Sequence, residues 1–131
     1  MNEAVFRATA RIGTRVRLQG RDPAIALDCV GLVLDAYNLP VEAAPRAYGL
    51  RGHVLKSIDS RLTTYFRRIR PKAVRPGDMM VLRCAAERYH FGVVGEQGLI
   101  HADAVIGRVL CRPWPAQWPV VRVYRKRMRR S

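Results

Sequence analysis

The apolar residues of this chain follow two different spacings, which divide the sequence into a helical part and a strand-forming part. Up to about residue 70 they recur every three to four positions, as in amphipathic helices. After Pro71 they form short β-like runs separated by turns. Helices followed by strands are typical of an α+β domain and not of alternating βαβ units. We therefore expect N-terminal helices packed on a small antiparallel sheet.

The first part contains three segments with helical spacing. Asp28 suits an N-cap, so a buried helix should begin at Cys29. The apolar residues that mark this helix are Val30, Val33, Leu34 and Tyr37. Residues 2–12 and 52–69 carry similar stripes, the first ending in Ile12 and the last containing Leu62 and Phe66. The segment 13–27, rich in glycine and basic residues, is expected to be an irregular loop.

The second part should supply four or five antiparallel strands. The turn Pro76-Gly77-Asp78 precedes the first of them, and Glu96-Gln97-Gly98 separates two others. The expected strands cover 79–83, 89–94, 99–102, 105–111 and 120–124.

Size and composition favour one self-supporting domain without a membrane span. The chain has 131 residues, 49% of them hydrophobic, which excludes the composition of disordered chains. The longest stretch without Asp, Glu, Lys or Arg is 113–121, far below the roughly 20 residues of a spanning helix. Charges at Glu3, Arg7 and Arg11 interrupt any apolar signal core, so we expect no signal peptide and synthesis in the cytoplasm.

The net charge of +14 indicates an anionic partner. Residues 104–131 contain eight basic residues and no acidic one, and we expect 125–131 to form a basic tail after a domain spanning 1–124. Anionic envelope polymers or a neighbouring protein fit this charge, and nucleic acid is a secondary candidate. Because 21 of the 24 basic residues are arginine, a GC-rich coding sequence is an alternative explanation of the charge.

Cys29 is the candidate nucleophile, because a thiol in the first turn of a helix faces the positive end of the helix dipole. We expect its thiolate to be favoured, so an electrophile should label it before the other two cysteines. The alternative is an inert core cysteine. Of the three histidines, His90 and His101 lie on two strands of one expected hairpin, which allows the two imidazoles to be cross-strand neighbours. In that arrangement one imidazole acts as base while the other fixes its tautomer. The alternative is two unrelated histidines, which spacing alone favours.

Four segments occur in an order that resembles the NlpC-type cysteine peptidases, a papain-like family of bacterial cell-wall endopeptidases. They are Asp28-Cys29-Val30-Gly31-Leu32-Val33, Arg75-Pro76-Gly77-Asp78, His90-Phe91-Gly92-Val93-Val94 and Leu99-Ile100-His101-Ala102. The resemblance implies a papain-like fold, with Cys29 as nucleophile, His90 as general base and His101 as the third, orienting member. It also implies cleavage of a γ-D-glutamyl to diamino-acid bond in peptidoglycan, without a cofactor.

The sequence resembles a short branch of that family found in phage tails or gene-transfer particles, which carry the enzyme to the cell wall. One position departs from the pattern. The tyrosine expected after the first Gly-Thr pair is absent, because Gly13-Thr14 is followed by Arg15-Val16. The backbone N–H of Cys29 is then the assigned oxyanion donor, and the second donor is unassigned.

Several other residues have both a functional and a structural interpretation. Trp114 and Trp118 line a substrate groove or cover the edge of the core. Cys84 and Cys111 are expected in the core, and zinc is disfavoured because no C-x-x-C or H-x-x-x-H spacing occurs. Two other functions remain open at this point: a basic particle or nucleic-acid-binding protein without turnover, and a papain-like acyltransferase or deamidase.

Overall fold

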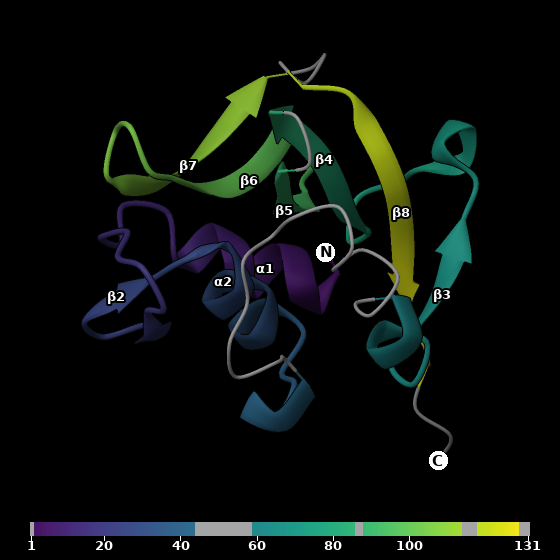
Figure 1. Ribbon diagram of the computed structural model, residues 1–131, viewed down its shortest axis with the longest axis horizontal. Helices are drawn as coiled ribbons and strands as arrows, with labels where there is room; N and C mark the ends of the chain where they lie inside the picture. Colours follow the sequence, from purple (N-terminus) through teal and green to yellow (C-terminus); the bar gives the residue numbers. More distant parts are fainter. Residues whose placement is uncertain (1, 44–58, 86–87, 114–117, 129–131) are drawn as a thin grey trace.

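The computed structural model describes residues 2–43, 59–85, 88–113 and 118–128 (Figure 1). The helices are α1 (Glu3–Ala10) and α2 (Cys29–Ala36), with short 3-10 turns η1 (Val41–Ala43) and η2 (Pro71–Ala73). The strands are β1 (Arg21–Asp22), β2 (Ala26–Leu27), β3 (Phe66–Ile69), β4 (Met79–Ala85), β5 (Arg88–Val94), β6 (Gly98–Asp103), β7 (Arg108–Pro113) and β8 (Val120–Lys126). Across these residues no helix has the length and apolar character that crossing a membrane requires.

Six strands form one antiparallel sheet in the order β3-β8-β4-β5-β6-β7. In Figure 1 this sheet arches over α1 and α2. Helices on one side of an antiparallel sheet confirm the expected α+β class. The segment 13–27 is more regular than expected, because β1 and β2 pair as a short hairpin.

Each face of the sheet carries a cluster of buried apolar side chains, since alternate residues of a strand point to opposite sides. On the face toward the helices, Val81, Phe91 and Val93 join a large cluster with α1 and α2. On the other face, Met80, Leu82, Val94, Leu99 and Val123 form a smaller cluster with Trp118 against it.

The helix expected over 52–69 is wrong at its C-terminal end. Residues 52–58 lie outside the described part of the chain, and residues 59–62 are helical. Phe66, however, begins β3, which pairs with β8. Leu62 and Phe66 are both buried as predicted, but a spacing of four residues fits a helical face and also a turn that leads into a strand. Phe66 packs edge-on against the Tyr37 ring, with centroids 5.0 Å apart, and fixes the strand to the core.

Two expected boundaries also shift. The first helix ends at Ala10, and Ile12 is 45% exposed instead of buried. The strand expected from 105 begins at Arg108, because the Asp103 carboxylate accepts hydrogen bonds from the backbone N–H groups of Val105 and Ile106 and closes a turn first. At the C-terminal end, β8 runs to Lys126, so the first two residues of the expected basic tail belong to the sheet.

Candidate active site

Asp28 fixes the start of α2 and therefore the position of Cys29. Its carboxylate accepts hydrogen bonds from the backbone N–H groups of Gly31 at 2.7 Å and Gln19 at 3.0 Å. The Arg21 guanidinium forms an ion pair with the same carboxylate at 2.6 Å. Gly31 is required here, because a Cβ at this position would lie 2.1 Å from the Gly20 carbonyl oxygen. The chain before the helix is thus tied to its first turn.

The Cys29 thiol lies where α2 meets β5. Backbone N–H groups of Val30 and Phe91 point at its sulfur and lower its pKa, as does the charge of Arg21. Burial and the Asp28 carboxylate act more strongly in the opposite direction and raise the pKa of Cys29 to about 12. The expectation that the thiolate is favoured is therefore wrong for the protein without substrate, because desolvation of the thiol outweighs the helix dipole.

The two strand histidines form the pair that the hairpin predicts. His90 Nε2 and His101 Nδ1 are 2.9 Å apart, within hydrogen-bond distance, and the two rings are perpendicular. Gly92 lies opposite His101 in the β5–β6 ladder, so His90 is two residues away along the same face. Their predicted proximity as cross-strand neighbours is confirmed.

Both imidazoles are neutral at pH 7. Burial and, to a lesser extent, His101 lower the pKa of His90 to about 4, although the nearby Asp103 carboxylate acts to raise it. Burial is also the main cause that lowers the pKa of His101, with Asp103 opposing and Arg112 assisting. At pH 7 the site therefore combines a neutral thiol with a neutral imidazole pair.

Sequence reasoning missed Asp103, which lies two residues after His101 on the same strand. Its buried carboxylate accepts a hydrogen bond from the Arg112 guanidinium on β7 at 2.7 Å. Period-two spacing places His101 and Asp103 on one face of the strand and was the signal available. The turn at Asp103 and its ion pair hold the end of β6 against β7.

Trp118 covers the histidine pair. Its ring centroid is 5.5 Å from that of His90 and 5.8 Å from that of His101, edge-on to both. His101 is fully buried, and its Nε2 has no hydrogen-bond partner among the described residues. Trp118 therefore restricts access of water to the imidazoles, and its groove role remains a prediction.

The remaining candidate residues lie outside this site or outside the described part of the chain. Trp114 and His53 fall outside the described residues. Cys84 is half-buried, and Cys111 is exposed on β7, so the expectation of a core position is wrong for Cys111. Its strand lies at the edge of the sheet, where alternate side chains face solvent. Val16, which follows the Gly13-Thr14 pair where the family's tyrosine is expected, is half-buried against the core. Among the described residues no three His, Cys, Asp or Glu side chains are grouped to hold a metal.

No protein-family model and no curated protein sequence matches this chain. Three solved structures resemble it. NlpC1 from Trichomonas vaginalis is 21% identical with a TM-score of 0.69, and the alignment covers 93% of this chain and 42% of that one. NlpC2 from the same organism is 22% identical with a TM-score of 0.68, covering 93% and 44%. The NlpC/p60 domain of the peptidoglycan hydrolase SagA is 21% identical with a TM-score of 0.62, covering 92% and 94%.

The chain thus spans less than half the length of the two Trichomonas proteins and almost the whole SagA domain. At these identities the likeness establishes the fold. The helices packed on a six-stranded antiparallel sheet form the papain-like fold of NlpC/p60 domains, as the sequence motifs predict.

Proposed function

We propose that this protein is a cysteine peptidase or amidase that hydrolyses amide bonds of peptidoglycan stem peptides. Two contacts of β5 together carry the proposal. His90 on β5 is within hydrogen-bond distance of His101 on β6, and the next residue of β5, Phe91, directs its backbone N–H at the Cys29 sulfur. A fold shared with the NlpC/p60 domain of a peptidoglycan hydrolase supports the choice of substrate. The γ-D-glutamyl to diamino-acid bond follows only from the family resemblance.

The proposed first step is attack of the Cys29 sulfur on the amide carbon. His90 Nε2 is engaged with His101, so its Nδ1 is the nitrogen that would receive the thiol proton. His90 then returns this proton to the leaving amine as the C–N bond breaks and a thioester remains. In the second step His90 removes a proton from water, which attacks the thioester, and the proton returns to the Cys29 sulfur.

In this mechanism His101 is a positioning residue. For Nδ1 of His90 to act as a base, His90 must carry its hydrogen on Nε2 and donate it to His101 Nδ1. His101 then carries its own hydrogen on Nε2, which is buried beneath Trp118. The backbone N–H of Cys29 is the proposed oxyanion donor at the helix start.

The neutral thiol has a direct mechanistic consequence. With a pKa of about 12, Cys29 is almost entirely protonated at pH 7, so proton transfer to His90 must accompany the attack instead of preceding it. Substrate binding must therefore supply part of the energy that the thiolate lacks. The same observation favours a second candidate function, a basic particle protein that keeps the papain-like fold without turnover.

The domain assignment and delivery are parts of the same proposal. Residues 1–124 would form the catalytic domain, since the fold likeness extends over 93% of the chain. The basic residues of 104–131 would attach it to a phage-like particle or an anionic envelope polymer. This attachment would bring the enzyme to the cell wall.

The test is incubation of purified sacculi and defined muropeptides with the protein, followed by mass spectrometry of the released peptides. Release by the unmodified protein is expected to disappear in Cys29→Ala and to persist in Cys111→Ala, which removes an exposed thiol of the same chain. Equal products from the Cys29→Ala variant would contradict the peptidase. No release by any preparation would favour the particle protein without turnover.

A further inference from the structure

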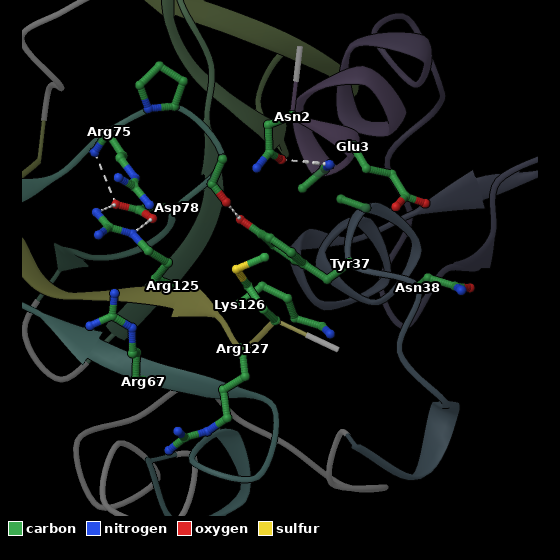
Figure 2. A pocket seen from close by; sticks show the side chains of 15 residues that line it. Asn2, Glu3, Tyr37, Asn38, Arg67, Arg75, Asp78, Arg125, Lys126 and Arg127 are labelled. Carbon is green, nitrogen blue, oxygen red and sulfur yellow. Dashed lines mark hydrogen bonds and ion pairs between the residues drawn. The ribbon is translucent and has the colours of Figure 1, made fainter. Parts of the chain in front are cut away.

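A hollow lies at the opposite end of α2 from Cys29 (Figure 2). Its volume is about 950 Å³. The walls come from the start of α1, the residues after α2, the turn before β4, and strands β3 and β8. Because α2 has eight residues, its two ends are separated by about 12 Å of helix. The hollow is thus distinct from the thiol site.

Basic side chains dominate the lining of this hollow. Five basic residues face only two acidic ones, Glu3 and Asp78. The basic residues are Arg67, Arg75, Arg125, Lys126 and Arg127. An excess of positive charge around a concave surface concentrates anions there.

The Asp78 carboxylate is buried, and both of its oxygens are hydrogen-bonded within the protein. It is 1% exposed, and both of its oxygens accept hydrogen bonds from Arg125, at 2.8 and 2.9 Å. The backbone N–H of Arg75 donates to the same carboxylate. Within the described residues, no carboxylate lies within ion-pair distance of the guanidinium groups of Arg67 and Arg75 or the ammonium group of Lys126. Arg127 donates to the Thr63 carbonyl, so among the described residues four of the five cations in the hollow lack an anionic partner.

The strand register adds an independent observation. Arg67 on β3 lies directly opposite Arg125 on β8, as Figure 2 also shows. Like charges in directly opposite positions destabilise a sheet, unless an anion lies between or beside them. Asp78 neutralises Arg125 alone. The Asp78 carboxylate offsets most of the repulsion between the two guanidinium groups, and Arg67 remains as an exposed cation beside this ion pair.

We propose that this hollow binds a compact phosphate group. Guanidinium groups from different elements can each hold two phosphate oxygens, and a phosphate carries more charge per volume than a carboxylate. A concave site lined from several elements suits a compact group better than the flat surface of a duplex. The phosphate belongs either to a free oligophosphate or to a phosphorylated sugar, which share this chemistry.

The experiment is calorimetric titration of the full chain at low salt with inorganic tripolyphosphate, glucose 6-phosphate and citrate. Saturable binding is expected for tripolyphosphate, and binding of glucose 6-phosphate as well would identify a sugar phosphate as sufficient. The double variant Arg67→Ala, Arg75→Ala should weaken binding roughly tenfold or more, since it removes two charge-assisted contacts. Arg68→Ala is the matched control: it removes one charge from the next position of β3, outside the hollow, and should change binding less than about twofold.

Thermal unfolding gives a second readout that does not depend on catalysis. Without anion, Arg67→Ala should unfold at nearly the same temperature, because Arg67 is exposed and Asp78 already neutralises the opposite Arg125. Tripolyphosphate should raise the midpoint of the unmodified protein and of Cys29→Ala, but not that of the double variant.

Three results would overturn the proposal: no saturable phosphate binding, equal affinity for citrate, or an equal loss of tripolyphosphate binding in a control variant. The charge-matched control is Arg68→Ala combined with Arg61→Ala, and a ten-nucleotide single-stranded DNA, expected to lose affinity equally in both double variants, shows the pattern of an unspecific polyanion. Tripolyphosphate following the pattern of the DNA is the third of these results. That result would mean general attraction of polyanions to the basic surface.

Discussion

Alkylation of Cys29 is expected to be slow, and the size of the effect follows from its surroundings. A thiol with a pKa of about 12 instead of 9.0 forms about 1000-fold less thiolate at neutral pH, equivalent to about 4 kcal/mol. The side chain is also only 8% exposed. Cys111 is exposed, and partial burial raises the pKa of its thiol to a lesser degree. Iodoacetamide at pH 7.5 should therefore label Cys29 at least roughly 100-fold more slowly than Cys111.

Timed alkylation followed by peptide mass spectrometry measures both rates in one sample. The rate at Cys29 should still rise between pH 8 and pH 10, as it must for a thiol that titrates above that range. His90→Gln should leave this rate nearly unchanged, because a neutral imidazole does not stabilise a thiolate by charge. Labelling of Cys29 before Cys111, with a plateau below pH 7 that His90→Gln abolishes, would refute the neutral pair and indicate a thiolate–imidazolium pair.

Three further predictions concern the groups around the thiol. The pKa of His90 is lowered from 6.5 to about 4 in the folded protein, so as the pH falls the unfolded chain is protonated at this imidazole before the folded one. The free energy of unfolding is therefore at its full value above pH 6.5 and should fall by up to about 3 kcal/mol as the pH drops toward 4. Urea unfolding at pH 7 and pH 4.5 measures this loss, and His90→Gln should reduce it; an identical loss in the variant would contradict the assignment. Asp28→Ala should cost about 2 kcal/mol of unfolding free energy, since it removes a helix cap and the ion pair with Arg21, and it should lower the pKa of the Cys29 thiol by removing a nearby negative charge. Asp28→Asn, which keeps a capping oxygen, should lose less stability in the same urea assay, and equal losses would argue against capping. Trp118→Ala should admit water to the histidines and raise their pKa, which moves the acidic limb of the pH–activity profile to higher pH. A change in kcat without any shift of this limb would argue that Trp118 only lines a substrate groove.

The segments around the candidate site were predictable because each carries its own local signal. Asp28 and the stripe behind it fix where α2 begins, and the turn at residues 96–98 fixes the pairing that brings His90 to His101. Both signals arise from neighbours within about a dozen residues. The hairpin allowed the two imidazoles to be neighbours, and the order of the four family-like segments made this arrangement the favoured one.

The predictions that were wrong, and the interactions that were missed, depend on contacts between segments that are distant in the sequence. The thiol pKa is set by burial against β5, more than 60 positions along the chain, and no pattern near Cys29 reports it. Phe66 joins a strand because β8 returns beside it, which the local spacing of apolar residues does not reveal. The ion pair between Asp103 and Arg112 similarly needs the β6–β7 register before it can be recognised.

The basic charge and the thiol chemistry occupy different ends of α2, and this separation has an energetic basis. Near the thiol, the charges of Arg21 and Arg112 are each compensated by a buried carboxylate, Asp28 and Asp103. The hollow lies at the far end of a helix about 12 Å long, so its charges act on the thiol more weakly than those of Asp28 and Arg21 beside it. An anion bound there would act to raise the pKa of Cys29, as burial and Asp28 already do, and so would leave the thiol neutral at pH 7. The protein can thus hold a polyanion at one end without altering the neutral thiol and imidazole pair at the other.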